Sequence, residues 1–128
     1  MVMGMADHDF VVMRIALYHF RKGDEVYADA SGLRGFPKPP TYEGSRGGTY
    51  RPDVYIRNKD IIYEVEPYGT LKNQIHQIKA FFRANPRKLI VVLSSGTEKG
   101  VPRIRKLLEK NGIKCRVMNY RELPFWNC

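Results

Sequence analysis

The sequence predicts an α/β domain whose mixed β-sheet has flanking helices. The first observation is length: 128 residues suit one domain, which we take to span residues 1–128. The second is the order of the patterns along the chain, which runs helix, three strands, helix, strand, helix, strand. The third is the apolar, β-branched run at residues 88–94, typical of a strand buried on both faces. A three-strand antiparallel meander continued by a right-handed parallel crossover accounts for this order.

The N-terminal segment predicts a helix and then a short strand. Residues 9–22 carry apolar side chains at helical spacing. These side chains are Phe10, Met13, Leu17 and Phe20. Asp7 or Asp9 is suited to cap the start of this helix, and Gly23 ends it. Residues 25–29 are β-prone and predict the first strand.

A β-hairpin and a second helix are expected next. Residues 53–57 alternate in polarity, residues 58–60 are typical of a tight turn, and residues 61–66 form the second strand. Thr70 is suited to cap a helix over residues 71–85. The apolar face of that helix is expected to consist of Leu71, Ile75, Ile78 and Phe82.

The last third of the chain predicts the parallel part of the sheet. Residues 101–111 form an amphipathic helix that ends at Gly112, and residues 113–118 form a strand parallel to strand 88–94. The inward side chains of the helix are expected to be Val101, Ile104, Leu107 and Leu108. In the tail, Phe125 and Trp126 are expected to pack on the body of the domain.

Charge and composition indicate a globular protein with an anionic partner. Hydrophobic residues make up 43% and charged residues 27% of the chain, so the chain is not disordered. The net charge of +9 favours a polyanion, most often nucleic acid, although a basic protein without such a partner remains the alternative. Cys115 and Cys128 do not form a CxxC pair and are interpreted as free thiols in a reducing cytoplasm. Neither a membrane span nor a signal peptide is predicted.

Three acidic side chains are expected to converge at one end of the hairpin. Glu64 and Glu66 alternate in one strand and therefore share a face, whereas Tyr63 and Val65 face the core on the other side. Asp53 begins the neighbouring strand, and the turn places it across from Glu64 and Glu66. Close carboxylates repel one another unless a cation neutralises them, and Mg²⁺ or Mn²⁺ prefers such oxygen ligands. The alternative is an ordinary solvated acidic surface.

This arrangement resembles the PD-(D/E)xK nuclease motif, with Pro52-Asp53 in one strand and Glu64-Val65-Glu66 in the next. The superfamily includes many restriction enzymes, archaeal Holliday-junction resolvases and RecB-type nucleases. The resemblance covers about residues 7–118. It implies a restriction-endonuclease-like fold and a metal-dependent endonuclease that cleaves DNA phosphodiester bonds with Mg²⁺ or Mn²⁺.

The resemblance also implies roles for single residues. Asp53 would be the bridging metal ligand and Glu64 the second ligand. Glu66 stands where the family usually has lysine, as it does in some restriction enzymes of the superfamily. It is therefore a third ligand, a substitute for the lysine, or the mark of a lost activity. Lys72 or Lys79 is a candidate for a displaced catalytic cation, with a solvated helix lysine as the alternative.

Members often have a further acidic ligand on the first helix. The candidates near that helix are Asp7, Asp9, Asp24 and Glu25, of which Glu25 ranks first. Gln74 and Gln77 follow the motif as a glutamine does in RecB-type members, but a surface amide is the expected role of each. The three histidines, His8, His19 and His76, are too scattered for a zinc site.

A basic loop over residues 30–51 is the candidate DNA-binding segment. It is rich in Gly and Pro, and no secondary structure is predicted for it. Its basic residues are Arg34, Lys38, Arg46 and Arg51. Together with Tyr68 and Lys72, which follow the acidic strand, they are suited to contact the DNA backbone. The alternative is a flexible loop whose charges only aid solubility.

Two functions follow from these observations. The first is a metal-dependent endonuclease acting on DNA, and the second is a nucleic-acid-binding protein with a catalytically inactive nuclease fold. A third, structural use of the fold is also open. A homodimer would supply the two sites that double-strand cleavage needs, with Phe125 and Trp126 as possible interface residues.

Overall fold

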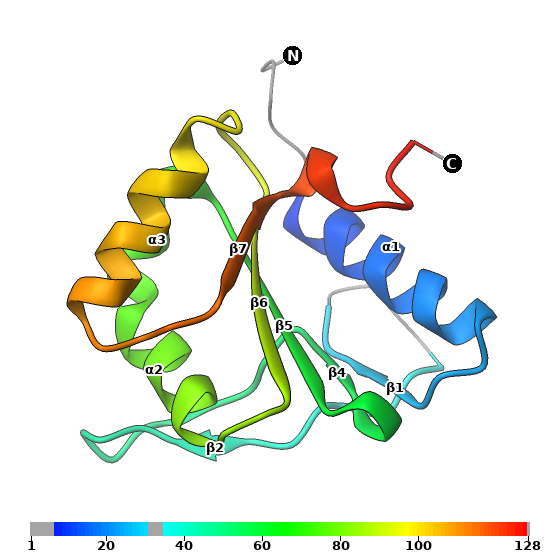
Figure 1. Ribbon diagram of the computed structural model, residues 1–128. Coiled ribbons are helices and arrows are strands. Elements are labelled where there is room, and N and C mark those ends of the chain that lie inside the picture. The colour runs from blue at the N-terminus through cyan, green and yellow to red at the C-terminus, as the bar shows by residue number, and fades with distance from the viewer. Residues whose placement is uncertain (1–6, 31–34, 128) are drawn as a thin grey trace.

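The domain is built on one five-stranded mixed sheet (Figure 1). The computed structural model describes residues 7–30 and 35–127. The strands lie in the order β1-β4-β5-β6-β7, and a separate two-stranded sheet is formed by β2 and β3. Their bounds are β1 Val26–Ala28, β2 Tyr42–Glu43, β3 Thr49–Tyr50, β4 Val54–Ile56, β5 Ile61–Glu66, β6 Lys88–Leu93 and β7 Arg116–Asn119. The helices are α1 His8–Arg21, α2 Ile75–Arg83 and α3 Gly100–Lys110.

The sheet has the mixed topology that the sequence predicts. β1, β4 and β5 are antiparallel neighbours, whereas β5, β6 and β7 run parallel. α2 connects β5 to β6, and α3 connects β6 to β7. The expectation of an α/β architecture with a mixed sheet and flanking helices is therefore confirmed. Among the described residues, none of the helices has the length and apolar character needed to cross a bilayer.

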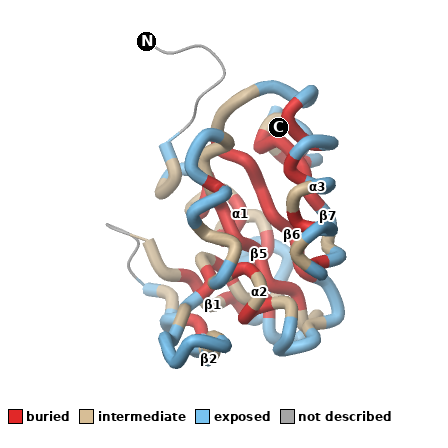
Figure 2. Tube along the Cα trace, turned by 90° about the vertical axis from the view of Figure 1, so that its left-hand side faces the viewer, coloured by how far each residue is buried: buried red, intermediate tan, exposed pale blue. Residues whose placement is uncertain are grey.

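The helices divide unequally between the two faces of the sheet. α1 and the C-terminal tail cover one face, and α2 and α3 cover the other (Figure 1). The central strands β5 and β6 are consequently buried over almost their whole length, as Figure 2 shows. Val65 belongs to the core beneath α1, whereas Ile62 belongs to the core beneath α2 and α3. The alternation of β5 thus sends its odd-numbered residues to α1 and its even-numbered residues to α2.

α1 begins where the sequence predicts, but it buries a different face. The Asp7 side chain accepts hydrogen bonds from the backbone N–H groups of Asp9 and Phe10, as expected of an N-cap. The stripe facing the sheet consists of Val11, Val12, Ile15, Ala16 and His19. The expected stripe is wrong as the core face, because Phe10 and Phe20 are both exposed. Both stripes have helical spacing, and the smaller side chains fit against the strands.

The second helix starts later than the sequence predicts. Residues Tyr68–Gln74 form a 3-10 helix, and Thr70 lies within it, so the prediction of Thr70 as the N-cap is wrong. The face directed at the sheet includes Leu71, Ile78 and Phe81. Phe82, which the apolar spacing favoured, is only partly buried. The tighter 3-10 turn rotates the helix face relative to a continuous α-helix.

Part of the segment after β1 forms a hairpin, which the sequence did not predict. Tyr42 pairs with Tyr50 and Glu43 with Thr49 in the antiparallel pair of β2 and β3. The Tyr42 ring meets the Phe81 ring of α2 edge-on at 5.9 Å between centroids, which ties the hairpin to the domain. A strand pair of two residues each gives too short an alternation to be recognised as a periodic pattern.

The C-terminal tail packs on α1. The Phe125 ring stacks on Tyr18 with centroids 4.1 Å apart, and the Arg14 side chain donates hydrogen bonds to the carbonyl oxygens of Phe125 and Trp126. The packing expected of the tail is confirmed. Because Phe125 is buried within the chain, it is not an exposed residue for a dimer interface.

Substitutions in α1 test which stripe carries the core. We expect Ile15→Ala to lower the free energy of unfolding by about 2–5 kcal/mol, because it leaves a cavity at a fully buried position. Phe20→Ala removes a larger side chain that is 58% exposed, and we expect a loss below about 1 kcal/mol. Urea unfolding of both variants checks this, and an equal loss in the two would contradict the assigned face.

Candidate functional site

Asp53 and Glu64 meet because of the register between β4 and β5. Val54 lies opposite Tyr63, which places Asp53 opposite Glu64. The backbone N–H of Asp53 donates to Glu64 Oε1 at 3.3 Å, and Asp53 Oδ2 accepts from the backbone N–H of Val65 at 2.8 Å. The Asp53 carboxylate therefore extends the ladder of hydrogen bonds beyond the end of β4.

Gln77 joins the two glutamates from the side of α2. Its side-chain amide donates to Glu64 Oε2 and, at 3.0 Å, to Glu66 Oε1. α2 presents Gln77 to the sheet because Ile78 and Phe81 beside it are buried in the same layer. Gln77 is consequently half-buried at the cluster, and its expected role as a surface amide is wrong.

His8 closes the cluster from the start of α1. Its Nε2 donates to Asp53 Oδ1 at 3.1 Å, and its Nδ1 donates to Asp9 Oδ1 at 2.9 Å. The hydrogen bond to Asp53, together with the charges of Asp53 and Asp9, raises the pKa of His8 to about 9 although partial burial opposes the shift. His8 is therefore charged near neutral pH and offsets the Asp53 carboxylate.

The burial of Glu64 dominates the electrostatics of the cluster. Glu64 is only 2% exposed, and the loss of hydration raises its pKa well above the usual value. The nearby carboxyl groups of Asp53 and Glu66 raise it further. Burial also raises the pKa of Glu66, which is less enclosed. Charge at Glu64 is thus costly in the isolated chain.

The donor chemistry of this acidic cluster (Asp53, Glu64 and Glu66, with Gln77 and His8 against it) suits a hard divalent cation. Carboxylate oxygens are the ligands that Mg²⁺ and Mn²⁺ prefer, and a cation would offset the cost of the buried charges. Across residues 7–30 and 35–127, however, no three Asp, Glu, His or Cys side chains stand at metal-ligand spacing. Their oxygens are instead engaged by the N–H groups of Gln77, His8 and the backbone.

Glu25 does not join the acidic cluster, which corrects the expectation of a fourth ligand there. β1 is antiparallel to β4, with Val26 opposite Ile56, so Glu25 lies at the turn end of the hairpin and Asp53 at the other end. The exposed Glu25 carboxylate instead lies 3.8 Å from the Arg57 guanidinium.

Tyr68 and Lys72 lie on the 3-10 helix that follows β5. They border a surface hollow that also contains Arg103 of α3, and Lys72 is exposed. Tyr68 packs against Gly96 and Gly100, where an added Cβ at Gly100 would approach the ring to 2.8 Å. In the part of the chain that the structure describes, no hydrogen bond or ion pair joins Lys72 to the three carboxylates.

The basic residues of the loop are differently placed. Lys38 and Arg46 are exposed, and Arg46 lies in the turn between β2 and β3. Arg51 is partly engaged, because its Nε donates to the Pro39 carbonyl at 3.0 Å and its guanidinium lies 3.7 Å from Asp29. Arg34 lies outside the described residues.

The sequence contains only weak signals for the two polar side chains that complete the cluster. Gln77 is separated from the hairpin by a turn of 3-10 helix, so its direction depends on how that turn is wound. His8 is the first residue of α1, and its approach to Asp53 depends on where the helix docks. For His8, the local clue is the Asp7 cap, which fixes the start of α1.

Comparison of the chain with protein-family models, with curated proteins and with solved structures gave no match.

The pH dependence of stability tests the contact between His8 and Asp53. A group whose pKa is raised on folding stabilises the fold below its ordinary pKa, and this contribution is lost as the pH rises through the folded-state value. In EDTA, we therefore expect the free energy of unfolding to fall between pH 6.5 and about 9, and His8→Gln to flatten this fall. Urea midpoints at several pH values measure it.

The matched control is His76→Gln, at an exposed position of α2. It should retain the wild-type dependence, because all other titrating groups are shared. Identical pH profiles for His8→Gln and the wild type would show that the contact does not hold in solution.

Proposed function

We propose that this chain is a metal-dependent endonuclease that cleaves DNA phosphodiester bonds, with a restriction-endonuclease-like arrangement of its sheet. The observation that carries the proposal is the acidic cluster, in which the almost fully buried Glu64 lies beside Asp53 at the end of two adjacent strands. A fold stabilised by packing alone would gain by replacing such a carboxyl with an apolar side chain.

In this proposal Asp53 and Glu64 hold Mg²⁺ or Mn²⁺, and Glu66 is the third ligand or acts beside it. A bound divalent cation supplies charge to the phosphate and lowers the pKa of a water molecule. Cation binding requires Gln77 and His8 to release their carboxylate partners. Both side chains lie at helix starts or on the first turns of helices, where such rotation does not disturb the sheet.

Glu66 replaces the family lysine in the proposed reaction. Its carboxyl is less buried than that of Glu64, and its raised pKa suits a group that accepts a proton from an attacking water. Lys72 and Tyr68, immediately beyond β5, are the proposed contacts to the phosphate backbone, together with Arg103. These three side chains border one hollow, so a single DNA strand can contact all of them.

The basic surface supports a nucleic acid as the substrate. The chain carries a net charge of +9, and some of its acidic groups are engaged in the cluster or in ion pairs such as that of Asp29 with Arg51. Exposed Lys38 and Arg46, with Arg51 and the undescribed Arg34, are the proposed loop contacts to phosphates. The proposed setting is the cytoplasm, and a homodimer would provide the second site for double-strand cleavage.

The alternative is a nucleic-acid-binding protein whose nuclease fold is inactive. Among the described residues, no lysine forms a hydrogen bond or an ion pair with the three carboxylates, and this favours the alternative. In that case the charged His8 and the amide of Gln77 balance the cluster permanently, and the burial that raises the pKa of Glu64 favours its neutral form.

Cleavage and cation binding are tested together on the full chain. We incubate the protein with plasmid, single-stranded and branched DNA in Mg²⁺, Mn²⁺ or EDTA. We expect cleavage that requires the cation, and a loss on the order of a hundredfold or more in Asp53→Asn and Glu64→Gln. Thermal unfolding should show a cation-dependent rise in melting temperature that both variants lose.

Glu109→Gln, an exposed glutamate on α3, is the matched control and should behave as the wild type. A cation-dependent stabilisation without cleavage of any DNA would favour the inactive alternative, provided that DNA binding weakens steeply with salt. The absence of both cation binding and cleavage in the wild type would overturn the proposed function.

A further inference from the structure

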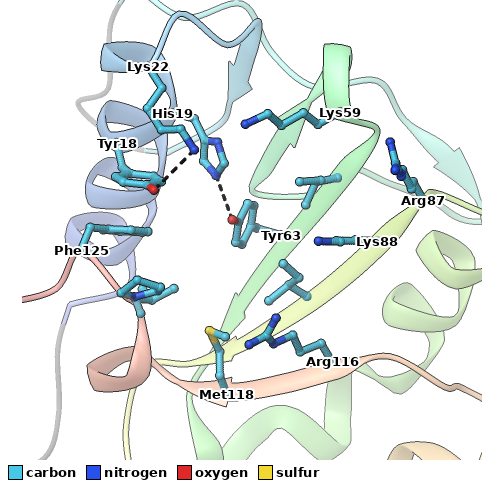
Figure 3. Close-up of a pocket in the computed structure, with 14 residues that line it drawn as sticks. Tyr18, His19, Lys22, Lys59, Tyr63, Arg87, Lys88, Arg116, Met118 and Phe125 are labelled. Atoms are coloured by element: carbon cyan, nitrogen blue, oxygen red, sulfur yellow. Dashed lines mark hydrogen bonds between the residues drawn. The ribbon is translucent and has the colours of Figure 1, made fainter.

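A pocket of about 470 Å³ lies on the α1 face of the sheet, away from the acidic cluster. Two helices cover the opposite face, but here the main contacts of α1 are with β1, β4 and β5, and Leu123 and Phe125 of the tail lie in the same core cluster as Met118 of β7. Strands are about 4.8 Å apart, so one helix of about 10 Å diameter cannot cover five of them. The uncovered strip over β5, β6 and β7 is the pocket (Figure 3).

The floor and one wall of this pocket are apolar and aromatic. Tyr63 on β5, Ile90 on β6 and Met118 on β7 form the floor. The wall is the stacked pair of Tyr18 and Phe125, whose rings are inclined by only 15°. A flat ligand group can lie between this floor and this wall, because aromatic side chains present planar apolar surfaces.

Cationic side chains surround the pocket. They are Lys22, Lys59, Arg87, Lys88 and Arg116. Lys88 pairs with Ile61 and Arg116 with Ile90 in the parallel ladders, so both side chains project from the same face as the floor. Figure 3 shows them beside Tyr63.

These charges are mostly unbalanced. Lys59 lies 3.1 Å from the Asp24 carboxylate, and Lys22 donates to the Tyr18 hydroxyl at 3.4 Å. Within residues 7–30 and 35–127, the side chains of Arg87, Lys88 and Arg116 have no carboxylate partner. Three neighbouring cations without an anion create a local positive potential.

Two carboxylates adjoin the pocket, those of Asp24 and Asp60, and both are already engaged. Asp60 Oδ2 accepts from the backbone N–H of Arg87 at 3.0 Å, and Asp60 Oδ1 accepts from the Tyr55 hydroxyl at 3.3 Å. Asp24 Oδ2 accepts from His19 Nδ1 at 2.8 Å, and Asp24 Oδ1 accepts from the Asn58 amide. His19 Nε2 in turn accepts from the Tyr63 hydroxyl at 2.8 Å. Burial lowers the pKa of His19, which agrees with this neutral tautomer. The relay holds the Tyr63 ring at the pocket floor, and within the described residues neither Asp24 nor Asp60 forms an ion pair with Arg87, Lys88 or Arg116.

We propose that this pocket binds a nucleoside phosphate, with its base against the aromatic floor and wall and its phosphate at Lys88 and Arg116. The volume falls within the range of small-molecule sites, about 300–1,000 Å³. Arg87 and Lys59 extend the cationic rim, and arginine is suited to bidentate phosphate contacts. The nucleotide comes from one of two sources, a free mononucleotide or the 5′-phosphorylated end of a DNA strand.

This site is separate from the proposed nuclease centre. Tyr63 and Glu64 are adjacent in β5 and therefore face opposite sides of the sheet. Binding at the pocket does not require a divalent cation, so it is measurable in EDTA. Failure of one proposal is thus distinguishable from failure of the other.

The experiment titrates the full chain in EDTA at fixed salt with deoxyadenosine monophosphate, inorganic phosphate, or a short 5′-phosphorylated single strand. Calorimetry gives the affinity, and backbone amide NMR shifts give the location. We expect shifts at Tyr63, Ile90 and Met118. We expect the double variant Lys88→Gln/Arg116→Gln to weaken binding roughly ten- to a hundredfold, because each lost contact is a hydrogen bond to a charged group.

The matched control is Arg105→Gln/Lys110→Gln, which removes the same charges from exposed positions on α3 and should retain the wild-type affinity. Saturable binding of the mononucleotide supports a free nucleotide as the source. Pocket shifts with the phosphorylated strand alone support a strand end. The proposal is overturned if neither nucleotide binds, if inorganic phosphate binds equally well, or if the control variant weakens as much as the pocket variant.

Discussion

The arrangement around the acidic cluster depends on one costly feature, the burial of the Glu64 carboxyl inside a five-stranded sheet. An isolated carboxylate there would lack hydration, so its surroundings must supply donors, protons or a cation. Asp53 supplies a backbone N–H, and Gln77 supplies an amide that also reaches Glu66. The position of α2 at this end of the sheet is consistent with that need, since α2 carries Gln77 on the face that buries Ile78.

β5 relates the two candidate sites through its alternation. Its even-numbered carboxylates face α2, and its odd-numbered Tyr63 faces α1 and the cationic pocket. A two-residue period allows one strand to present opposite chemistries on its two faces. The two faces are covered differently: α2 places Gln77 against the carboxylates, whereas on the other face α1 and the tail leave the pocket open. Glu64 and Glu66 thereby lie on one side of the sheet, and Lys88 and Arg116 of the pocket rim lie on the other.

The sequence predicts those parts of the fold that depend on local period and register. The hairpin turn alone places Asp53 opposite Glu64, because pairing in antiparallel strands follows from the turn. The sequence does not show whether Val11 and Ile15 or Phe10 lie on the core face of α1, since both stripes have helical spacing. The contacts of His8 and Gln77 depend on helix docking, and helix docking is a tertiary property. Glu25 shows the same limit, because the antiparallel direction of β1 carries it away from the cluster.

Glu66 changes what the cluster requires. A lysine at that position would offset one carboxylate, whereas Glu66 adds a third acidic group whose pKa burial already raises. With Glu66 in place of a lysine, the cluster therefore depends more strongly on a bound cation or on protonation. Without a cation, the cluster is balanced by groups that the structure already contains. A charged His8 lies against Asp53, and the Gln77 amide lies between the two glutamates. The active and inactive interpretations share this fold and this state. The active one requires that a divalent cation bind tightly enough to displace the Gln77 amide and the His8 contact, and that the bound cation then support cleavage of DNA.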